Sequence, residues 1–248
     1  MSRKVAVFGA HGRMGSATCD AIDAAPDLTL VARIGSDGSI AEAAHAGADT
    51  VVDFTTPDAV MDNVLAALAA GMNVVVGTSG LDEARVATIR ANVHGGTGVG
   101  VVIAPNFALG AVLLMRFARE AAPLFESVEI VELHHPDKLD APSGTATHTA
   151  EVISASRAAA QAAAMPDATS HALDGARGAS VAGVPVHSVR LRGLVAHEEV
   201  LMGNPGELLT IRHDSLDRQA FMPGVLLALR RVVDRPGVTV GLEDLLDL

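Results

Sequence analysis

A segment of fifteen residues past the middle of the chain, Glu132–Ala146, gathers side chains that could move protons; it reads ELHHPDKLDAPSGTA. Imidazole titrates near neutral pH, so His134 and His135 could give a proton to a substrate under working conditions. Lys138 and Lys4 are the only lysines in a chain that otherwise carries its positive charge on arginine. An ammonium group can release its proton when burial lowers its pKa, whereas a guanidinium stays charged. Position 138 is therefore a candidate proton donor or point charge.

Ser143, Gly144 and Thr145 follow at the predicted start of an alanine-rich helix. The N–H groups at a helix N-terminus, together with two hydroxyls, suit a carboxylate. Each residue alone also fits a plainer interpretation: solvated histidines beside a proline, or Ser143 as a helix N-cap. Zinc binding by the histidines with Asp137 or Asp140 would lack the i, i+4 spacing of common zinc sites. Taken together, the residues favour an anion-binding catalytic loop.

A strand must carry the two histidines to this loop. Ser127–His134 alternates apolar and polar side chains, as does a strand with one covered face. Pro136 ends the strand, so both imidazoles can reach one cleft although consecutive strand residues point to opposite faces. The surrounding sequence predicts two helices, a polar loop and three strands that pair antiparallel through short links. Their ranges are 108–122, 143–164, 165–180, 184–191, 194–202 and 207–212.

The first hundred residues alternate short apolar strands with helices, which predicts a parallel sheet covered on both faces. Thr56 is predicted to cap one helix with Pro57 at its first position, and Asp214 or Ser215 to cap a last helix. The predicted strands are 4–8, 28–33, 50–54, 73–76 and 99–104, and further helices are 13–24, 82–92 and 218–234. The fold class is therefore α/β. We predict a Rossmann-type parallel-sheet domain, residues 1–107 and 216–248, and an inserted α+β domain with a mixed or antiparallel sheet, residues 108–215.

Gly9, Gly12 and Gly15 follow the first strand in a G-x-x-G-x-x-G pattern and open the first helix. The backbone N–H groups and the helix dipole at such a turn hold the pyrophosphate of a dinucleotide, and Arg13 could add charge. The alternative is an ordinary strand–helix turn without a ligand. Two further segments, GTSG (77–80) and APNF (104–107), end the fourth and fifth strands, at the sheet edge where such folds bind ligands. The three loops together favour a dinucleotide site.

The choice between NADH and NADPH depends on the end of the second strand. Proteins that bind NAD usually place an acid there, on the ribose hydroxyls. Here the strand ends Ala32-Arg33-Ile34, and Asp37 lies further into the loop. Arg33 could meet the 2′-phosphate of NADP or could point to solvent. We therefore expect NADH and NADPH both to be used.

Composition excludes several classes of protein. The net charge of −11 over 248 residues argues against binding to a nucleic-acid backbone, and 49% hydrophobic with 19% charged residues indicates a globular protein. No run approaches the roughly 18 apolar residues of a membrane span, and the first residues enter a strand without an apolar leader, so we expect a cytoplasmic protein. The absence of tyrosine excludes a Tyr–Lys proton relay. The single cysteine, Cys19, excludes an internal disulfide and a cysteine-rich metal site, and no metal is expected.

Five motifs together closely resemble the bacterial dihydrodipicolinate reductase (4-hydroxy-tetrahydrodipicolinate reductase) family: ELHHPDKLDAPSGTA, GAHGRMG, VVDFTTP, GTSG and APNF. The resemblance spans essentially the whole chain, and the histidine–lysine motif is its most specific part. It implies NAD(P)H-dependent reduction of 4-hydroxy-tetrahydrodipicolinate (dihydrodipicolinate) to tetrahydrodipicolinate in lysine and diaminopimelate biosynthesis. It also implies a homotetramer.

The resemblance further implies roles for single residues. His134 would be the acid/base residue and Lys138 a second proton donor. The two carboxylates of the substrate would be held by His135, Lys138, Gly144 and Thr145. The cofactor would be lined by Gly9, Ala10, His11, Gly12, Arg13, Met14, Gly77, Thr78, Ser79, Ala104, Pro105, Asn106 and Phe107. The missing acid after the second strand departs from an NAD-selective pattern and makes Arg33 a further cofactor candidate.

Two other interpretations remain open at the level of sequence. Another two-domain NAD(P) oxidoreductase acting on a small anionic substrate, such as a sugar dehydrogenase, would lack the histidine–lysine motif followed by Ser-Gly-Thr. A nucleotide-sensing regulator would need an output element, for instance a basic pair of DNA-binding helices, and the sequence shows none.

Overall fold

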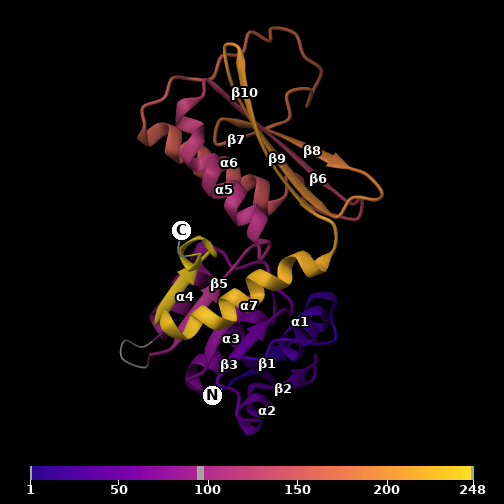
Figure 1. Ribbon diagram of the computed structural model, residues 1–248, viewed down its shortest axis with the longest axis vertical. Coiled ribbons are helices and arrows are strands. Elements are labelled where there is room, and N and C mark those ends of the chain that lie inside the picture. Colours follow the sequence, from indigo (N-terminus) through magenta and orange to yellow (C-terminus); the bar gives the residue numbers. More distant parts are fainter. Residues whose placement is uncertain (1, 94–97, 247–248) are drawn as a thin grey trace. The chain divides into compact units, whose positions relative to one another are not determined.

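The computed structural model describes residues 2–93 and 98–246. The chain divides into two compact units: unit 1 comprises Met1–Leu109 and Arg218–Leu248, and unit 2 comprises Gly110–Asp217. Unit 1 is built on a six-stranded parallel sheet and unit 2 on a mixed five-stranded sheet (Figure 1). The predicted fold class, a Rossmann-type parallel sheet plus an inserted α+β part, is confirmed. The functions predicted for the two parts stay predictions.

The sheet of unit 1 has the order β11-β5-β4-β3-β1-β2, and its neighbouring strands are all parallel. Its strands are short runs rich in valine because helices cover both faces, so that even Val5, Ala6 and Val7 are 0% exposed. The strands are β1 (Arg3–Phe8), β2 (Leu28–Ile34), β3 (Thr50–Asp53), β4 (Asn73–Val76), β5 (Gly100–Ile103) and β11 (Gly237–Val240). The helices are α1 (Arg13–Asp23), α2 (Ile40–His45), α3 (Val60–Ala69), α4 (Glu83–Asn92) and α7 (Met222–Arg231).

Strand β11 and helix α2 were not predicted from the sequence, and two helix caps were predicted at the wrong residues. Thr56 does not cap α3: its carbonyl oxygen accepts the N–H groups of Ala59 and Val60 in a turn, and the helix begins only at Val60. Asp214 and Ser215 do not cap the last helix either, because both belong to a strand of unit 2. The last helix is instead preceded by a 3-10 turn at residues 218–221.

The sheet of unit 2 has the order β10-β9-β6-β8-β7, with helices α5 and α6 on one of its faces (Figure 1). Alternate residues of a strand point to the same face, so the buried residues Val128, Ile130 and Glu132 of β6 share one side. The strands are β6 (Ser127–His134), β7 (Ala179–Val181), β8 (Val184–Arg190), β9 (Ala196–Asn204) and β10 (Glu207–Ser215), and the helices are α5 (Leu109–Ala121) and α6 (Gly144–Ala159).

The predicted pairing in unit 2 is right for β9 with β10 and wrong for β8 with β9. Strand β6 lies between β8 and β9, pairing parallel with β8 and antiparallel with β9. The last two residues of the predicted polar loop, 179 and 180, belong to β7. Helix α6 ends at Ala159, earlier than expected, with Gln161 in a left-handed conformation at φ 54°. The parallel pairing has a consequence for chemistry because it sets Arg190 of β8 opposite His134.

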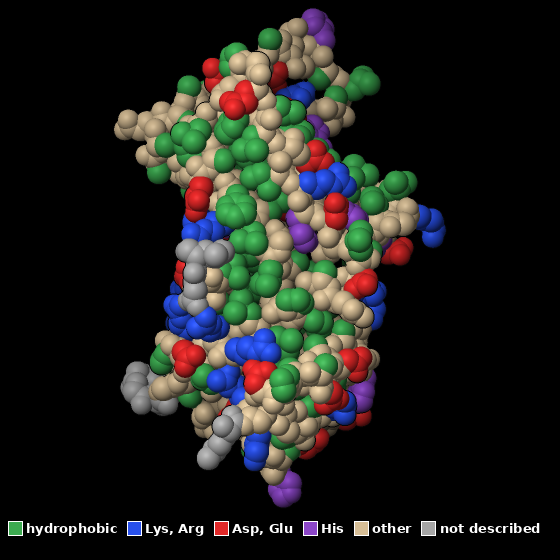
Figure 2. Space-filling model, in the orientation of Figure 1, with side chains coloured by type: hydrophobic (Ala, Val, Ile, Leu, Met, Phe, Trp, Pro, Cys, Tyr) green, Lys and Arg blue, Asp and Glu red, His purple; other side chains and the backbone are tan. Residues whose placement is uncertain are grey.

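The surface mixes charges of both signs. On the face shown in Figure 2, Lys and Arg side chains are interspersed with acidic ones. Across residues 2–93 and 98–246, no helix is both long and apolar enough to cross a membrane.

Candidate active site

The glycine turn between β1 and α1 has no room for a side chain at Gly9 or Gly15. Gly9 adopts a left-handed φ of +71°, and a Cβ there would lie 2.3 Å from the carbonyl oxygen of Phe54. A Cβ at Gly15 would lie 2.1 Å from the carbonyl oxygen of Gly9. Gly12 caps α1 without a side chain, and the first turn of the helix carries no acid. The turn therefore fits the diphosphate of a dinucleotide, which needs a close backbone and a helix N-terminus free of competing anions.

The segments after β3, β4 and β5 meet at two aromatic rings. Phe54 and Phe107 pack edge to face, with centroids 5.6 Å apart and planes at 62°. A Cβ at Gly77 would lie 2.1 Å from the ring of Phe54 and 2.8 Å from that of Phe107. The structure thus brings the GTSG and APNF segments together at the carboxyl ends of the strands.

Asp53, at the end of β3, ties these loops to one another. Its buried carboxylate accepts hydrogen bonds from the backbone and hydroxyl of Thr55 (3.0 and 2.7 Å), from the amide of Asn63 (2.8 Å) and from the hydroxyl of Thr78 (2.6 Å). Each donor is a neutral group, so the aspartate serves as a hub that holds Thr78 and the GTSG segment in place. Asp53 was not predicted from the sequence as a functional residue, although its place at the carboxyl end of a buried strand was a usable signal.

The remaining predicted cofactor residues divide by exposure. Arg33 is half exposed, and its guanidinium lies 2.6 Å from Asp23 on α1, so this cation is already paired. His11 lies against Gly35, where a Cβ would be 3.0 Å from the imidazole. Those with buried side chains are Ala10, Thr78, Ala104 and Phe107; the exposed ones are His11, Gly12, Arg13, Ser79 and Pro105; and Gly9, Met14, Gly77 and Asn106 are intermediate.

In unit 2, Glu132 is the centre of a hydrogen-bond cluster at the end of β6. Its side chain is completely buried, and its Oε2 lies 2.5 Å from Nδ1 of His134. Arg190 donates to both carboxylate oxygens, at 2.9 and 2.8 Å, and the backbone N–H of Ser143 donates to Oε1 at 3.2 Å. A carboxylate only accepts, so Nδ1 of His134 carries its hydrogen toward Glu132 and Nε2 is left for other partners.

These donors stabilise the ionised form of Glu132. Burial alone would raise its pKa, but hydrogen bonds from His134, Arg190 and Ser188 outweigh burial and hold the pKa at about 2. Neither Glu132 nor Arg190 was predicted from the sequence as a site residue. Glu132 could have been found from the sequence, because it stands two residues before His134 on the same strand face. Arg190 could not have been found in this way, because only the pairing of β8 with β6 brings it next to Glu132 and His134.

Lys138 lies in the histidine–lysine loop, residues 134–145, and its ammonium is 2.7 Å from Oδ1 of Asp140. Asp140 also accepts the backbone N–H of Gly144, and although burial would raise its pKa, the hydrogen bond from Lys138 and these neighbours lower it. Thr145 and the half-buried His135 lie in the same loop, and the carbonyl of His135 accepts the N–H of Lys138 at 3.2 Å. Two of the groups predicted to bind a substrate carboxylate therefore already hold a carboxylate of the chain.

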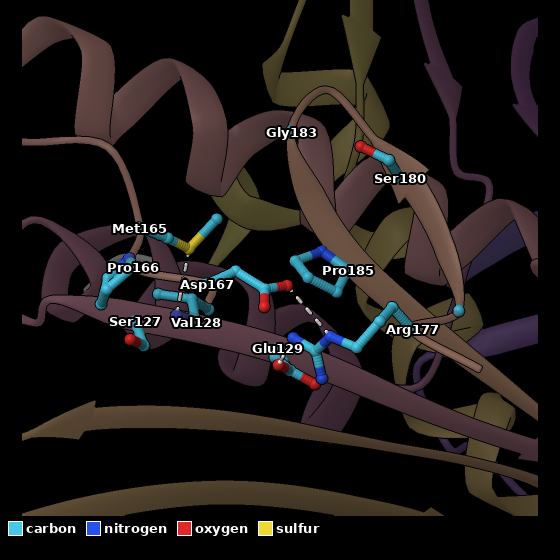
Figure 3. Close-up of a pocket in the computed structure, with 11 residues that line it drawn as sticks. Ser127, Val128, Glu129, Met165, Pro166, Asp167, Arg177, Ser180, Gly183 and Pro185 are labelled. Atoms are coloured by element: carbon cyan, nitrogen blue, oxygen red, sulfur yellow. Dashed lines mark hydrogen bonds and ion pairs between the residues drawn. The ribbon is translucent and has the colours of Figure 1, made fainter. Parts of the chain in front are cut away.

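A separate cavity of about 300 Å³ lies under the loop between α6 and β7 and is lined by none of the predicted site residues. There, Arg177 bridges Glu129 of β6 and Asp167 of the loop (Figure 3). The two acids share one cation, so we infer that these ion pairs hold the loop against β6. In the part of the chain that the structure describes, no group of three or more His, Cys, Asp or Glu side chains is placed to hold a metal ion.

Comparisons with known proteins match both units. Residues 3–107 match the family model described as dihydrodipicolinate reductase, N-terminus, and residues 110–246 match that of its C-terminus. A 4-hydroxy-tetrahydrodipicolinate reductase of Cutibacterium acnes is 58% identical, covering 99% of both chains, and one of Streptomyces coelicolor is 57% identical, covering 99% of this chain and 98% of that one. A dipicolinate-bound dihydrodipicolinate reductase from Paenisporosarcina sp. is 34% identical with a TM-score of 0.88, covering 99% of this chain and 100% of that one.

Proposed function

The chain belongs to the dihydrodipicolinate reductase family, and from that premise we propose that it reduces 4-hydroxy-tetrahydrodipicolinate to tetrahydrodipicolinate with NADH or NADPH. It is thus an oxidoreductase whose reaction serves lysine and diaminopimelate biosynthesis. The observation that carries the proposal is the buried Glu132 carboxylate, which orients His134 beside a loop that binds a carboxylate through Lys138 and Gly144.

Unit 1 would hold the coenzyme. The glycine turn would take its diphosphate, and the GTSG and APNF segments, fixed by Asp53 and the Phe54–Phe107 contact, would line the rest of it. When bound, the nicotinamide would supply the hydride. The fit rests on the lack of space for any side chain at Gly9, Gly15 and Gly77.

Unit 2 would hold the substrate and supply protons. A small dicarboxylate such as the dipicolinate bound by the Paenisporosarcina relative would be held by His135, Lys138, Gly144 and Thr145. Glu132 fixes the ring of His134 through Nδ1, which leaves Nε2 to deliver a proton when the imidazole is charged. Lys138 would stabilise developing negative charge as an ammonium and act as a second proton donor.

An absorbance assay tests the proposal directly. The condensation product of pyruvate and aspartate semialdehyde is added to the purified protein with NADH or NADPH, and loss of nicotinamide absorbance is followed. Consumption of coenzyme that depends on this product supports the reductase assignment. Consumption with a keto sugar, or reduction of NAD(P)+ by a polyol, together with no consumption in the presence of this product, would instead favour the other oxidoreductase interpretation.

The two neighbouring histidines are expected to differ in kinetics. His134→Gln should lower kcat with a modest effect on KM, because the proton donor is lost while substrate contacts remain. His135→Gln should mainly raise KM, because it would remove a carboxylate partner. Steady-state kinetics of both variants measure the difference. Equal changes in both parameters for both variants would show that these roles are divided wrongly.

Coenzyme use is expected to be dual, with kcat/KM for NADH and NADPH within about tenfold, a gap of about 1.4 kcal/mol. The pairing of Arg33 with Asp23 supports this, because neither an unpaired cation nor a carboxylate on the ribose distinguishes the two coenzymes. Kinetics with both coenzymes under one set of conditions measure it. A preference of a hundredfold would contradict it and would place Arg33 or Asp37 at the ribose, according to which coenzyme wins.

We also propose that the protein assembles as a homotetramer in the cytoplasm. The support for assembly is the face of the unit 2 sheet opposite α5 and α6, which carries half-buried apolar residues, among them Val131, Leu133 and Leu201, together with Leu208, 69% exposed. A sheet face of this kind suits burial against another copy of the chain.

The cytoplasmic location is supported by the single free thiol of Cys19.

A further inference from the structure

A second buried acid lies beside Glu132. Glu198 on β9 is only 5% exposed and stands directly opposite Glu132 in the antiparallel pairing of β9 with β6. On its other side, Glu198 is opposite His213 of β10. Opposite residues of paired strands share a face and lie in contact range, so Glu132, Glu198 and His213 form one row across three strands.

Of these two acids, only Glu132 forms an ion pair with an arginine, Arg190, among the described residues. Oε1 of Glu198 has no hydrogen-bond partner among the described residues. The groups that face Glu198 are Glu132 from β6, His213 from β10 and Thr149 from α6. Burial lowers the pKa of His213, which disfavours a positive charge on this imidazole. An ionised Glu198 would therefore be a buried charge without a counter-ion, next to a second carboxylate.

Thr149 is the polar neighbour that favours the charged form of Glu198, because a hydrogen bond from its hydroxyl lowers the pKa of Glu198. That hydroxyl has a single hydrogen and also lies 3.0 Å from the carbonyl oxygen of Thr145, so the two acceptors compete for it. Burial raises the pKa of Glu198 to about 7, and the negative charge of Glu132 acts in the same direction. Burial, the unpartnered Oε1 and the position opposite Glu132 therefore favour a protonated carboxyl at Glu198.

We propose that Glu198 is a positioning residue for His134, acting through Glu132 by keeping its proton; this inference rests on the acid role given to His134 above. With Glu198 neutral, Glu132 is the single negative charge of the row, balanced by Arg190 and held to His134. When Glu198 loses its proton, two like charges share one buried row. Their repulsion loosens the contact that orients His134, and turnover falls.

The first test needs no substrate: the melting temperatures of the wild type and Glu198→Gln are compared from pH 6 to 8.5. A group with a raised folded-state pKa contributes stability that is complete below its ordinary 4.5 and is lost as pH rises through about 7. The wild type should therefore lose stability relative to Glu198→Gln across this range. Glu198→Met, also uncharged and of similar length, should behave like Glu198→Gln. Glu199→Gln is the matched control, because Glu199 is the next residue on β9, pairs with Arg212 and points to the opposite face.

The second test is the pH dependence of kcat/KM for the same proteins. The ratio of Glu198→Gln to wild type should rise on the order of tenfold between pH 6 and 8.5, as expected when one group must stay protonated. Parallel pH dependence of wild type and Glu198→Gln in both tests, or the same change in Glu199→Gln, would overturn the inference. A wild type without reductase activity would remove the proposed function and the role of His134 with it, and the melting curves would still report the Glu198 proton separately.

Discussion

Lys138→Ala is expected to lower kcat by about 10²–10⁴-fold, the usual effect of losing one positioned proton donor. The side chain is only 22% exposed and carries the ammonium nearest the N-terminus of α6 in the histidine–lysine loop. Its removal would take away both a proton donor and a partner for a substrate carboxylate. Steady-state kinetics of the purified variant measure the effect.

Two companion variants separate charge from proton transfer. Lys138→Arg should recover substrate binding more than turnover, because a guanidinium keeps the charge and does not release the proton. Lys4→Ala removes the other lysine, on β1, and should leave kcat near the wild-type value. A Lys138→Ala enzyme that turns over at the wild-type rate would remove Lys138 from the site.

Arg190→Leu is expected to destabilise the protein by about 3–5 kcal/mol, the range seen when one partner of a buried ion pair is removed. The variant leaves the buried carboxylate of Glu132 without its arginine counter-ion. The side chain of Glu132 is 0% exposed, and both of its oxygens accept hydrogen bonds from Arg190. Urea unfolding measures the loss. Arg177→Leu is the control: it also breaks ion pairs of β6, but these are partly exposed and solvent screens them. A variant as stable as the wild type would mean that water reaches Glu132.

The same pair makes stability depend on pH. The pKa of Glu132 is about 2 in the folded protein and 4.5 ordinarily, so its contribution is complete above about pH 4.5 and is lost as pH falls toward 2. That contribution is about 3 kcal/mol, from 1.36 kcal/mol per pKa unit. In Arg190→Leu, the free energy of unfolding should depend less on pH between about 4.5 and 2. Replacing both charges, with Glu132→Met added to Arg190→Leu, should recover part of the stability, because no unpaired ion is then buried.

The parts of the site that the sequence predicts are those encoded locally. His134, Lys138 and Gly144 lie within one short segment, and its strand and helix follow from period-2 alternation and a serine N-cap, which accepts the N–H of Ala146. The glycine turn follows from spacing in the same way. Pairing between distant segments is not local, and for this reason Arg190 and Glu198 were missed: each reaches Glu132 only because β6 lies between β8 and β9.

The failed helix caps have a related cause. Thr56-Pro57 has the composition of a helix start, but the carbonyl of Thr56 closes a turn with the N–H groups of Ala59 and Val60, and α3 begins only at Val60. The preceding residue, Thr55, is held by the buried carboxylate of Asp53, a contact that the local sequence does not reveal. The missed β11 is a similar case, because Gly237–Val240 forms a strand only through its pairing with β5.

If Lys138 holds a substrate carboxylate as proposed above, its contact with Asp140 makes substrate binding an exchange of anions. Asp140 is tethered two residues from the lysine, so it competes for the ammonium at a high effective concentration. An incoming dicarboxylate would gain only the difference in free energy between two similar ion pairs, because the Lys138–Asp140 pair must first be broken. When the product leaves, Asp140 would take back the ammonium of Lys138, so the loop would keep its ion pair between turnovers. The arrangement would therefore favour fast release of the product more than tight binding of the substrate.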